Sequence, residues 1–248
     1  MSLLKSIFQF IFSIYFLIVF FFVTALGLIV YRIQYFFFKT KHESTYKNFL
    51  FRGIGTVTHL LAFINVEKKH HHKYSEDKAY VVVGNHNANI DIPINTSSCP
   101  SEINMKFLSK IENTKLPVLG PIVKGMCVIV DRESIASRQE TFKLMEDELK
   151  KGYSIFLYPE GTRNKTDEQL KNFYNGAFSL AIEHQLPIVV NTLVGTKKVN
   201  SSKKALSILP GKVTSHWEAP IPTKGMTKDD IPYLKEQVRA IMIARLEA

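Results

Sequence analysis

The stretch YVVVGNHNANIDIP, residues Tyr80–Pro93, sets the fold that we expect for this chain. Its β-branched run ends at Gly84, which is typical of a buried strand. Asn85, His86 and Asp91 follow on the loop that such a strand would hold in place. A histidine can accept a proton near neutral pH, and a carboxylate nearby can fix its tautomer and favour the imidazolium. We therefore take His86 and Asp91 as a candidate general-base pair.

A capped turn is the alternative interpretation of this short segment, because aspartate commonly bonds to its own backbone in turns. No serine or cysteine adjoins the pair as a nucleophile. The hydroxyl that His86 activates is therefore expected to belong to a substrate. Such a mechanism requires neither a metal ion nor a covalent enzyme intermediate.

The composition indicates a large folded domain with an anionic partner. Of 248 residues, 46% are hydrophobic and 22% are charged, which is enough for a sizeable core. The net charge of +10 favours nucleic acid, an anionic lipid surface or a phosphorylated substrate. We place a nucleic-acid binder last, since no recognised module is present. Cys99 and Cys127 are expected to be core residues in a reducing compartment.

An uncharged apolar stretch, Ile7–Val30, lies near the N-terminus and is interrupted by Gln9, Ser13, Thr24 and Gly27. It is longer than the roughly 20 apolar residues that cross a bilayer. A secretory signal is the alternative, but the apolar part is too long and no small-residue cleavage site follows. We predict a retained membrane anchor.

The next segments lead from this anchor to the soluble domain. Tyr46–Val66 has helical spacing but many polar residues, so it is either a membrane-lying partner of the first helix or a soluble amphipathic helix packed on the domain. Glu67–Lys78 is charged and contains the run His70–His72. Adjacent histidines cannot share one face of a helix or strand, so we predict a solvated basic linker here instead of a metal site.

Strand and helix patterns alternate over the remainder of the chain. The strand-like runs are Ala79–Gly84, Met105–Ser109, Cys127–Val130, Tyr153–Tyr158, Ile188–Val194 and Lys212–Trp217. The helical patterns are Ser134–Lys150, Asn172–His184 and about Asp230–Leu246. This alternation predicts an α/β sandwich around a mixed central sheet. We expect anchoring helices in residues 1–66, the linker in 67–78 and a catalytic domain in 79–248.

Two further polar clusters fall near the carboxyl ends of strand-like runs, where α/β sheets bind ligands. The first lies within Phe107–Arg132, where a loop through Pro117 and Gly120 is expected, and the second is FLYPEGTR, Phe156–Arg163. In the second, Gly161 would let backbone approach a ligand closely, and the planar fork of Arg163 matches phosphate.

Together these motifs resemble those of the glycerolipid acyltransferases, specifically the 1-acyl-sn-glycerol-3-phosphate acyltransferases. The matching residues, in order, are Asn85, His86 and Asp91; Lys110, Pro117, Gly120, Asp131 and Arg132; Pro159–Arg163; and Leu186–Val189. The resemblance covers Tyr80 to about Val194. The N-terminal region is similar to bacterial members in which two helices embed in one leaflet, which implies a membrane-embedded two-helix hairpin rather than a spanning helix.

The resemblance implies a role for each motif. His86 would deprotonate the free glycerol hydroxyl and Asp91 would orient His86. Lys110 and Arg163 would bind the acceptor phosphate. The supporting residues would be Asn85, Glu160, Gly161, Thr162 and Arg132.

The role of Arg132 and the sequence of Phe173–Gly176 need separate comment. Arg132 is expected to hold a strand end through Asp131 or another carboxylate, with a phosphate contact as the alternative. The family often has a Phe-Lys-basic-Gly segment after its P-E-G-T-R motif. Phe173–Gly176 lacks both basic residues. A secondary contact with the acceptor phosphate would therefore be missing, and this affects which headgroup the acceptor is expected to carry.

The expected activity is transfer of a fatty acyl group from acyl carrier protein or coenzyme A to 1-acyl-sn-glycerol-3-phosphate, giving phosphatidic acid without a cofactor. The resemblance further implies a membrane-associated enzyme on the cytoplasmic face of a bacterial inner membrane, with acyl carrier protein as a candidate partner. An acyltransferase acting on another lyso-lipid, such as lyso-ornithine lipid, is one alternative. The other is a non-catalytic protein that binds anionic lipid.

Overall fold

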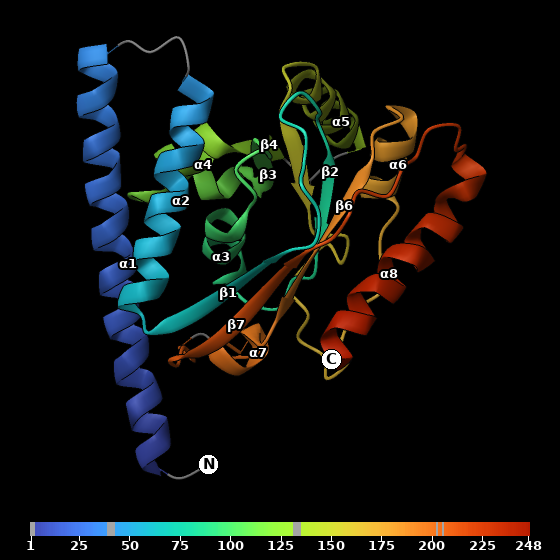
Figure 1. The fold of residues 1–248 in the computed structure, drawn as a ribbon. Helices are drawn as coiled ribbons and strands as arrows, with labels where there is room; N and C mark the ends of the chain where they lie inside the picture. The colour runs from blue at the N-terminus through green and yellow to red at the C-terminus, as the bar shows by residue number, and fades with distance from the viewer. Residues whose placement is uncertain (1–2, 39–42, 131–134, 202, 205) are drawn as a thin grey trace.

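The computed structural model describes residues 3–38, 43–130, 135–201, 203–204 and 206–248. The described residues form one seven-stranded sheet in the order β1-β7-β6-β2-β5-β3-β4 (Figure 1). Its strands are β1 (Ile64–His70), β2 (Val81–Gly84), β3 (Met105–Lys110), β4 (Cys127–Val130), β5 (Ser154–Leu157), β6 (Ile188–Val194) and β7 (Gly211–Trp217). The β6–β7 pair is antiparallel and the other pairs are parallel. The predicted mixed sheet is therefore confirmed.

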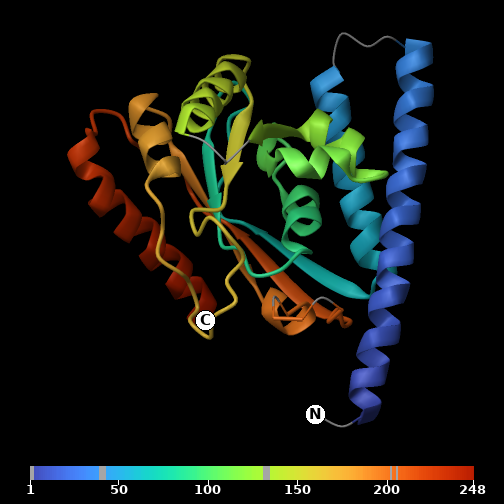
Figure 2. The same cartoon turned by 180° about the vertical axis from the view of Figure 1, so that it is seen from behind.

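Helices cover both faces of this sheet, as the two opposite views show (Figures 1 and 2). One face carries α5 (Ile135–Lys150), α6 (Gly176–Glu183) and α8 (Ile231–Glu247). The other carries α2 (Glu43–Leu61), α3 (Asp91–Ser98) and α4 (Leu119–Met126). Three short elements complete the fold: η1 (Ile111–Lys115), α7 (Thr196–Val199) and η2 (Lys228–Asp230).

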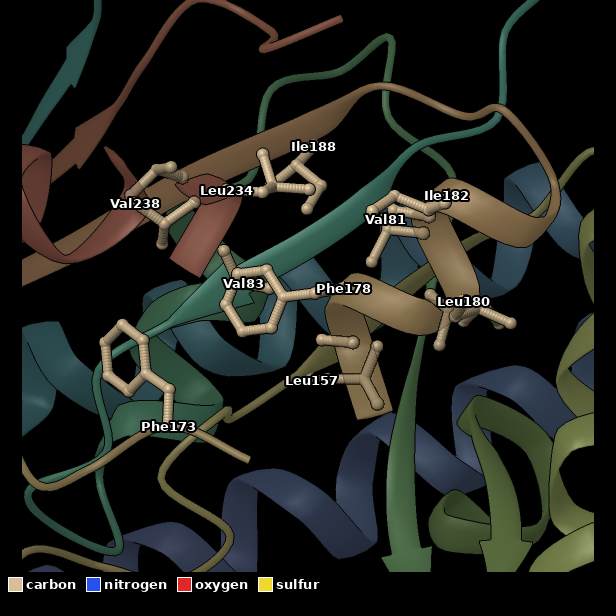
Figure 3. Close-up of a cluster of buried hydrophobic side chains, with 14 of the residues drawn as sticks. Val81, Val83, Leu157, Phe173, Phe178, Leu180, Ile182, Ile188, Leu234 and Val238 are labelled. Carbon is tan, nitrogen blue, oxygen red and sulfur yellow. The ribbon is translucent and has the colours of Figure 1, made fainter. Parts of the chain in front are cut away.

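Strand β2 belongs to both layers because successive side chains of a strand point to opposite faces. Val81 and Val83 pack in the core beneath α6 and α8, next to Phe178 and Leu234 (Figure 3). Val82 packs in the core on the α2 side. All three valines are fully buried, so the β-branched run is the centre of the fold.

The six strands expected from the sequence are confirmed, with ends that differ by at most two residues. The seventh strand, β1, was missed. It runs parallel to β7 and occupies the end of the expected second helix and the start of the expected linker. The linker prediction is therefore wrong for Glu67–His70. The reason is that β1 is an edge strand exposed over its charged second half, so its sequence has the polarity of a linker.

Two short helices also differ from the expected loops. Helix α3 begins at Asp91 and holds Pro93 in its first turn, where a proline is tolerated. Helix α4 takes the place of the loop expected through Gly120. A Cβ atom at Gly120 would overlap the carbonyl of Thr114 in η1, so glycine is required for this close approach. Tertiary contacts form both helices, since their local propensity is weak.

The N-terminal region forms two helices packed against each other, α1 (Leu3–Phe38) and α2. Residues 3–33 of α1 are long and apolar enough to cross a membrane by length and composition. In both views α1 lies beside α2 and extends past the end of the sheet that carries β1 and β7 (Figures 1 and 2). The expected pair of N-terminal helices is thus present.

The polar interruptions of the apolar stretch face the rest of the protein. The side-chain amide of Gln9 donates to the carbonyl of Ser207 at 2.9 Å. The backbone N–H of Ile208 donates to the hydroxyl of Ser13 at 2.9 Å. These contacts fix the first half of α1 against the α/β domain.

The second half of α1 packs closely on α2. Thr24 is fully buried, and a Cβ atom at Gly27 would overlap the side chain of Ile54 on α2. The opposite side of α1 exposes large apolar side chains, including Ile7, Phe8, Ile11, Ile18, Phe22, Leu26, Ile29 and Ile33. One stripe of α1 therefore contacts protein, and the other has no covering among the described residues.

Candidate active site

The candidate catalytic residues follow β2 and β5, which are neighbours in the sheet. Val83 pairs with Leu157, so the residues after the two strands meet at the same edge. His86 leaves β2 and Glu160 leaves β5, and the backbone N–H of His86 donates to Glu160 Oε1 at 2.7 Å. The expected position of the site at the carboxyl ends of the strands agrees with this contact.

His86 and Asp91 form the expected pair. His86 Nδ1 lies 2.9 Å from Asp91 Oδ2. The same oxygen accepts the backbone N–H groups of Asn87 at 2.6 Å and Ala88 at 2.7 Å. A carboxylate can only accept, so Nδ1 carries the proton and Nε2 is left as the proton acceptor. The Asp91 side chain is fully buried, whereas 16% of the His86 side chain remains exposed.

Tyr158 holds the other side of the imidazole. Its ring stacks on His86 with centroids 3.9 Å apart and an interplanar angle of 14°. The Tyr158 hydroxyl accepts a hydrogen bond from the Asn95 amide at 3.0 Å. Burial raises the pKa of Tyr158 well above its usual range, and the charge of Asp91 adds to this effect. Tyr158 is therefore a neutral ring that restricts the orientation of His86.

Glu160 is a fully buried carboxyl group that joins three segments. Besides the N–H of His86, it accepts the backbone N–H of Lys171 through Oε2 at 2.9 Å. Burial raises the pKa of Glu160, and these two backbone hydrogen bonds act in the opposite direction. The Lys171 ammonium donates to Thr162 Oγ1 at 2.7 Å and to the Glu160 carbonyl at 3.3 Å.

The backbone around His86 is fixed by two asparagines. Asn85 exchanges two hydrogen bonds with the backbone of Leu193, at 2.9 and 2.8 Å, so its side chain extends the pairing of β2 with β6. The backbone N–H of Asn164 donates to the His86 carbonyl at 2.7 Å. The loop after β5 therefore holds both the N–H and the carbonyl of His86.

The predicted cations lie at the same edge. Lys110 ends β3 and is exposed, and Arg163 follows β5 and is half-buried. Within the described residues, neither side chain forms a hydrogen bond or an ion pair. Arg132, the remaining predicted supporting residue, lies outside the described residues.

Gly161 has the conformation that the sequence motif requires. Its φ of +72° lies in the left-handed region, and a Cβ atom there would come within 2.8 Å of the Tyr174 ring. An open hollow of about 330 Å³ lies beside this loop. It is lined by Glu168, Lys171, Asn172, Phe173 and Tyr174.

Three residues of the site were not identified from the sequence: Tyr158, Asn95 and Lys171. Asn95 lies four positions after Asp91, so the spacing of a helix from Asp91 to Ser98 would have placed both on one face. Tyr158 lies within the quoted FLYPEGTR stretch. No local signal separates Lys171 from the other lysines, since its role depends on the fold of its loop.

Metal ligands do not gather around His86 in the described residues. Within them, the group of His, Cys, Asp or Glu side chains that could hold a metal ion consists of His71, His216 and Glu218, and it includes neither His86 nor Asp91. The candidate site thus brings together an imidazole paired with a carboxylate, a stacked tyrosine ring and two cationic side chains at the same edge of the sheet.

Comparisons with known proteins bear on the family of this chain. A family model described as Acyltransferase matches residues 64–193. The 1-acyl-sn-glycerol-3-phosphate acyltransferase alpha of Mus musculus is 27% identical over 190 residues, which are 73% of this chain and 63% of that protein. The chloroplastic 1-acyl-sn-glycerol-3-phosphate acyltransferase BAT2 of Brassica napus is 37% identical over 126 residues, 50% of this chain and 36% of that protein.

A solved structure has the same fold. The crystal structure of the 1-acyl-sn-glycerophosphate (LPA) acyltransferase PlsC from Thermotoga maritima superposes with a TM-score of 0.82, at 19% identity, and covers 98% of this chain and 96% of that chain. The likeness therefore extends to the N-terminal helices as well as to the sheet.

The buried Glu160 predicts a pH dependence of stability. Its raised folded pKa means that its contribution is fully present below the unfolded value near 4.5 and is lost as pH rises through the folded pKa. The stability advantage of the wild type over Glu160→Gln should therefore shrink with rising pH. Chemical unfolding of both proteins at a series of pH values measures it.

Glu67→Gln serves as the control, because the hydrogen bond from Lys212 lowers the pKa of Glu67. There the wild-type advantage should grow as pH rises through the range just below the usual glutamate value. An advantage over Glu160→Gln that also grows with pH would contradict the assignment of Glu160 as a carboxyl group destabilised by burial.

Proposed function

Because this chain belongs to the acyltransferase family, whose model matches residues 64–193, we propose that it acylates 1-acyl-sn-glycerol-3-phosphate to give phosphatidic acid. The acyl group comes from a thioester of coenzyme A or acyl carrier protein. The observation that carries the proposal is the His86–Asp91 contact at the sheet edge that also holds Lys110 and Arg163. The names of the Mus musculus and Brassica napus relatives support the same acceptor.

The proton transfer starts at His86. Asp91 accepts the Nδ1 proton, so Nε2 takes the proton of the acceptor hydroxyl as its oxygen attacks the thioester carbonyl. The buried charge of Asp91 favours the imidazolium that forms, and the Tyr158 ring faces that cation at stacking distance. The imidazolium then returns its proton to the leaving thiolate. Transfer is direct, with no acyl-enzyme.

The acceptor phosphate is held by cations at the same edge. Arg163 offers a planar fork that matches two phosphate oxygens, and Lys110 offers a point charge. Neither is neutralised by another described residue. Fixing the phosphate places the free hydroxyl within reach of His86, which lowers the entropic part of the barrier.

The N-terminal helices provide the membrane association. The exposed apolar stripe of α1 is suited to lipid, while Gln9 and Ser13 bind its other side to the domain. A helix held along the domain in this way fits a hairpin embedded in one leaflet better than an isolated span. We place the catalytic domain on the cytoplasmic face of the membrane, where acyl thioesters are available.

The direct test is an assay of the purified chain in detergent with lysophosphatidate and parallel acyl-CoA and acyl-carrier-protein donors. Labelled phosphatidic acid is the expected product. Competition with a lyso-ornithine lipid separates the main proposal from transfer to another lyso-lipid. Absence of transfer with every acceptor would favour the non-catalytic lipid-binding alternative.

Removing the base should abolish transfer. A glycerol hydroxyl is a weak nucleophile near neutral pH, and general-base catalysis typically contributes about 10²–10⁴-fold. We expect His86→Ala to lose at least that factor and Asp91→Asn to lose less, since the imidazole remains. Single-turnover transfer from labelled thioester measures both, with His184→Ala as a matched control and circular dichroism to verify folding. A folded His86→Ala protein with near-normal turnover would refute the mechanism.

Arg163→Ala should raise the KM for the acceptor far more than the KM for the thioester, because only the acceptor offers its phosphate to the guanidinium. A charge-assisted contact of this kind is worth on the order of 1.5–3 kcal/mol. Steady-state kinetics with each substrate varied in turn measures the effect, and Lys165→Ala is the neighbouring control. Equal changes for both substrates would move Arg163 out of the acceptor site.

Tyr158 should act on kcat through the orientation of His86. Tyr158→Phe keeps the stacked ring and should retain kcat within a few-fold, whereas Tyr158→Leu should lose about tenfold or more because the imidazole is no longer confined. Both KM values should remain close to those of the wild type. Equal losses in the two variants would show that the hydroxyl bonded to Asn95, and not the ring, is what matters.

Membrane attachment should resist salt and yield to detergent. Burial of the apolar stripe of α1 in lipid is insensitive to charge screening, whereas attraction of basic residues to anionic lipid is not. Sedimentation of washed membranes after treatment with high salt or with detergent distinguishes the two. Complete release by salt would show that basic residues alone hold the protein on the membrane.

A further inference from the structure

The three adjacent histidines at the end of β1 contact different partners. His70 contacts the Ser98 carbonyl of α3 at 2.9 Å, and the His72 ring packs edge-on against Tyr74. His71 lies on the other face of the sheet, where its Nε2 is 3.1 Å from Nδ1 of His216. This is the alternation expected along a strand. The run of three histidines alone predicted no metal site, because the partner histidine lies on β7, far along the chain.

A carboxylate completes this group. Glu218 Oε1 lies 3.9 Å from His71 Nε2, and the ligand atoms of His71, His216 and Glu218 all lie within 4.8 Å of one another. Backbone hydrogen bonds hold the cluster in place. The N–H of His71 donates to the Trp217 carbonyl at 2.9 Å, and the N–H of Glu218 donates to the Val190 carbonyl at 3.0 Å.

Two imidazoles and one carboxylate are a ligand set that Zn²⁺ prefers. Bonds of about 2.0–2.2 Å in a tetrahedron place ligand atoms roughly 3.3–3.5 Å apart, so the observed separations need only small rotations of the side chains. His216 is buried, whereas 34% of the His71 side chain is exposed. The site is therefore open on one side, where water can supply a fourth ligand.

Arg245 on α8 orients the carboxylate. Its Nε donates to Glu218 Oε1 at 2.7 Å and its Nη2 to Oε2 at 3.1 Å. Each carboxylate oxygen has two lone pairs, so Oε1 keeps one for a metal. The positive charge of the Arg245 guanidinium repels a metal cation bound to Glu218. Only ions that bind nitrogen ligands strongly can overcome this repulsion, so transition metals are favoured over Mg²⁺ or Ca²⁺.

We propose that His71, His216 and Glu218 bind one divalent transition-metal ion of the zinc class. The ion joins the residue after β1 to the end of β7, and Arg245 links the site to the last turn of α8. The site lies on the sheet face that carries α8, whereas the contacts of His70 and Lys68 with α3 lie on the opposite face. It is independent of the proposed acyl transfer.

The test uses the full-length chain without an affinity tag, in detergent, with Zn²⁺ as the probe. Equilibrium dialysis with metal analysis should give one Zn²⁺ per chain for the wild type, and Co²⁺ should give the visible absorption of a four-coordinate ion. His71→Ala should weaken Zn²⁺ binding by about tenfold or more. His72→Ala is the matched control from the same run and should bind as the wild type does.

His71 is an exposed side chain, so its removal should leave the fold intact, which circular dichroism checks. Zn²⁺ should raise the melting temperature of the wild type and of His72→Ala but not that of His71→Ala or Glu218→Gln. Equal affinity in His71→Ala and His72→Ala would overturn the proposal. So would a wild type that binds no Zn²⁺ at micromolar concentrations.

Discussion

One oxygen of a buried carboxylate determines the form of the loop that carries His86. Asp91 Oδ2 accepts the backbone N–H groups of Asn87 and Ala88 as well as the imidazole N–H of His86. These donors are three consecutive residues, and Asp91 follows three positions after the last of them, so the chain must curl around Asp91 before α3 begins. Loss of this acceptor would leave buried N–H groups without partners, which is costly. The same oxygen therefore shapes the loop and orients the imidazole of His86.

Helix α3 extends this arrangement to the N-terminal helices. At its far end Lys68 donates to the Ser97 carbonyl at 2.6 Å. On its flank α2 approaches so closely that a Cβ atom at Gly55 would come within 2.6 Å of the Pro93 carbonyl. Since Gly27 permits a similar approach of α1 to α2, a continuous series of close contacts joins the exposed apolar stripe of α1 to the loop of His86. In the proposed membrane-bound state, the base would thus have a fixed orientation relative to the lipid surface.

The loop after β5 lacks the basic residues that the family often has there, and the structure shows which side chains take their place. Where the family often has basic residues, this chain has Tyr174, whose ring packs against Gly161. Lys171 lies three residues earlier, and its ammonium reaches Thr162 and the Glu160 carbonyl. A cation is therefore present beside the proposed phosphate site, although it comes from a different position in the sequence. In the proposed acyl transfer, the preference for an acceptor headgroup depends on whether this cation contacts the acceptor.

The sequence by itself determined six of the seven strands and the order of the candidate catalytic motifs. Six strands, the His86–Asp91 pair and the edge shared with Glu160 could be predicted because each depends on local patterns: β-branched runs, glycine stops and short spacings. The prediction of membership in the glycerolipid acyltransferases is confirmed by the comparisons. Only the tertiary structure decided the identity of β1, the stacking of Tyr158 on His86 and the meeting of His71 with His216. Strand β1 is charged along an exposed edge, so its sequence resembles a linker. Tyr158 lies 72 positions from His86, and His216 lies 145 positions from His71. The physical reason is that no local periodicity carries information over such separations.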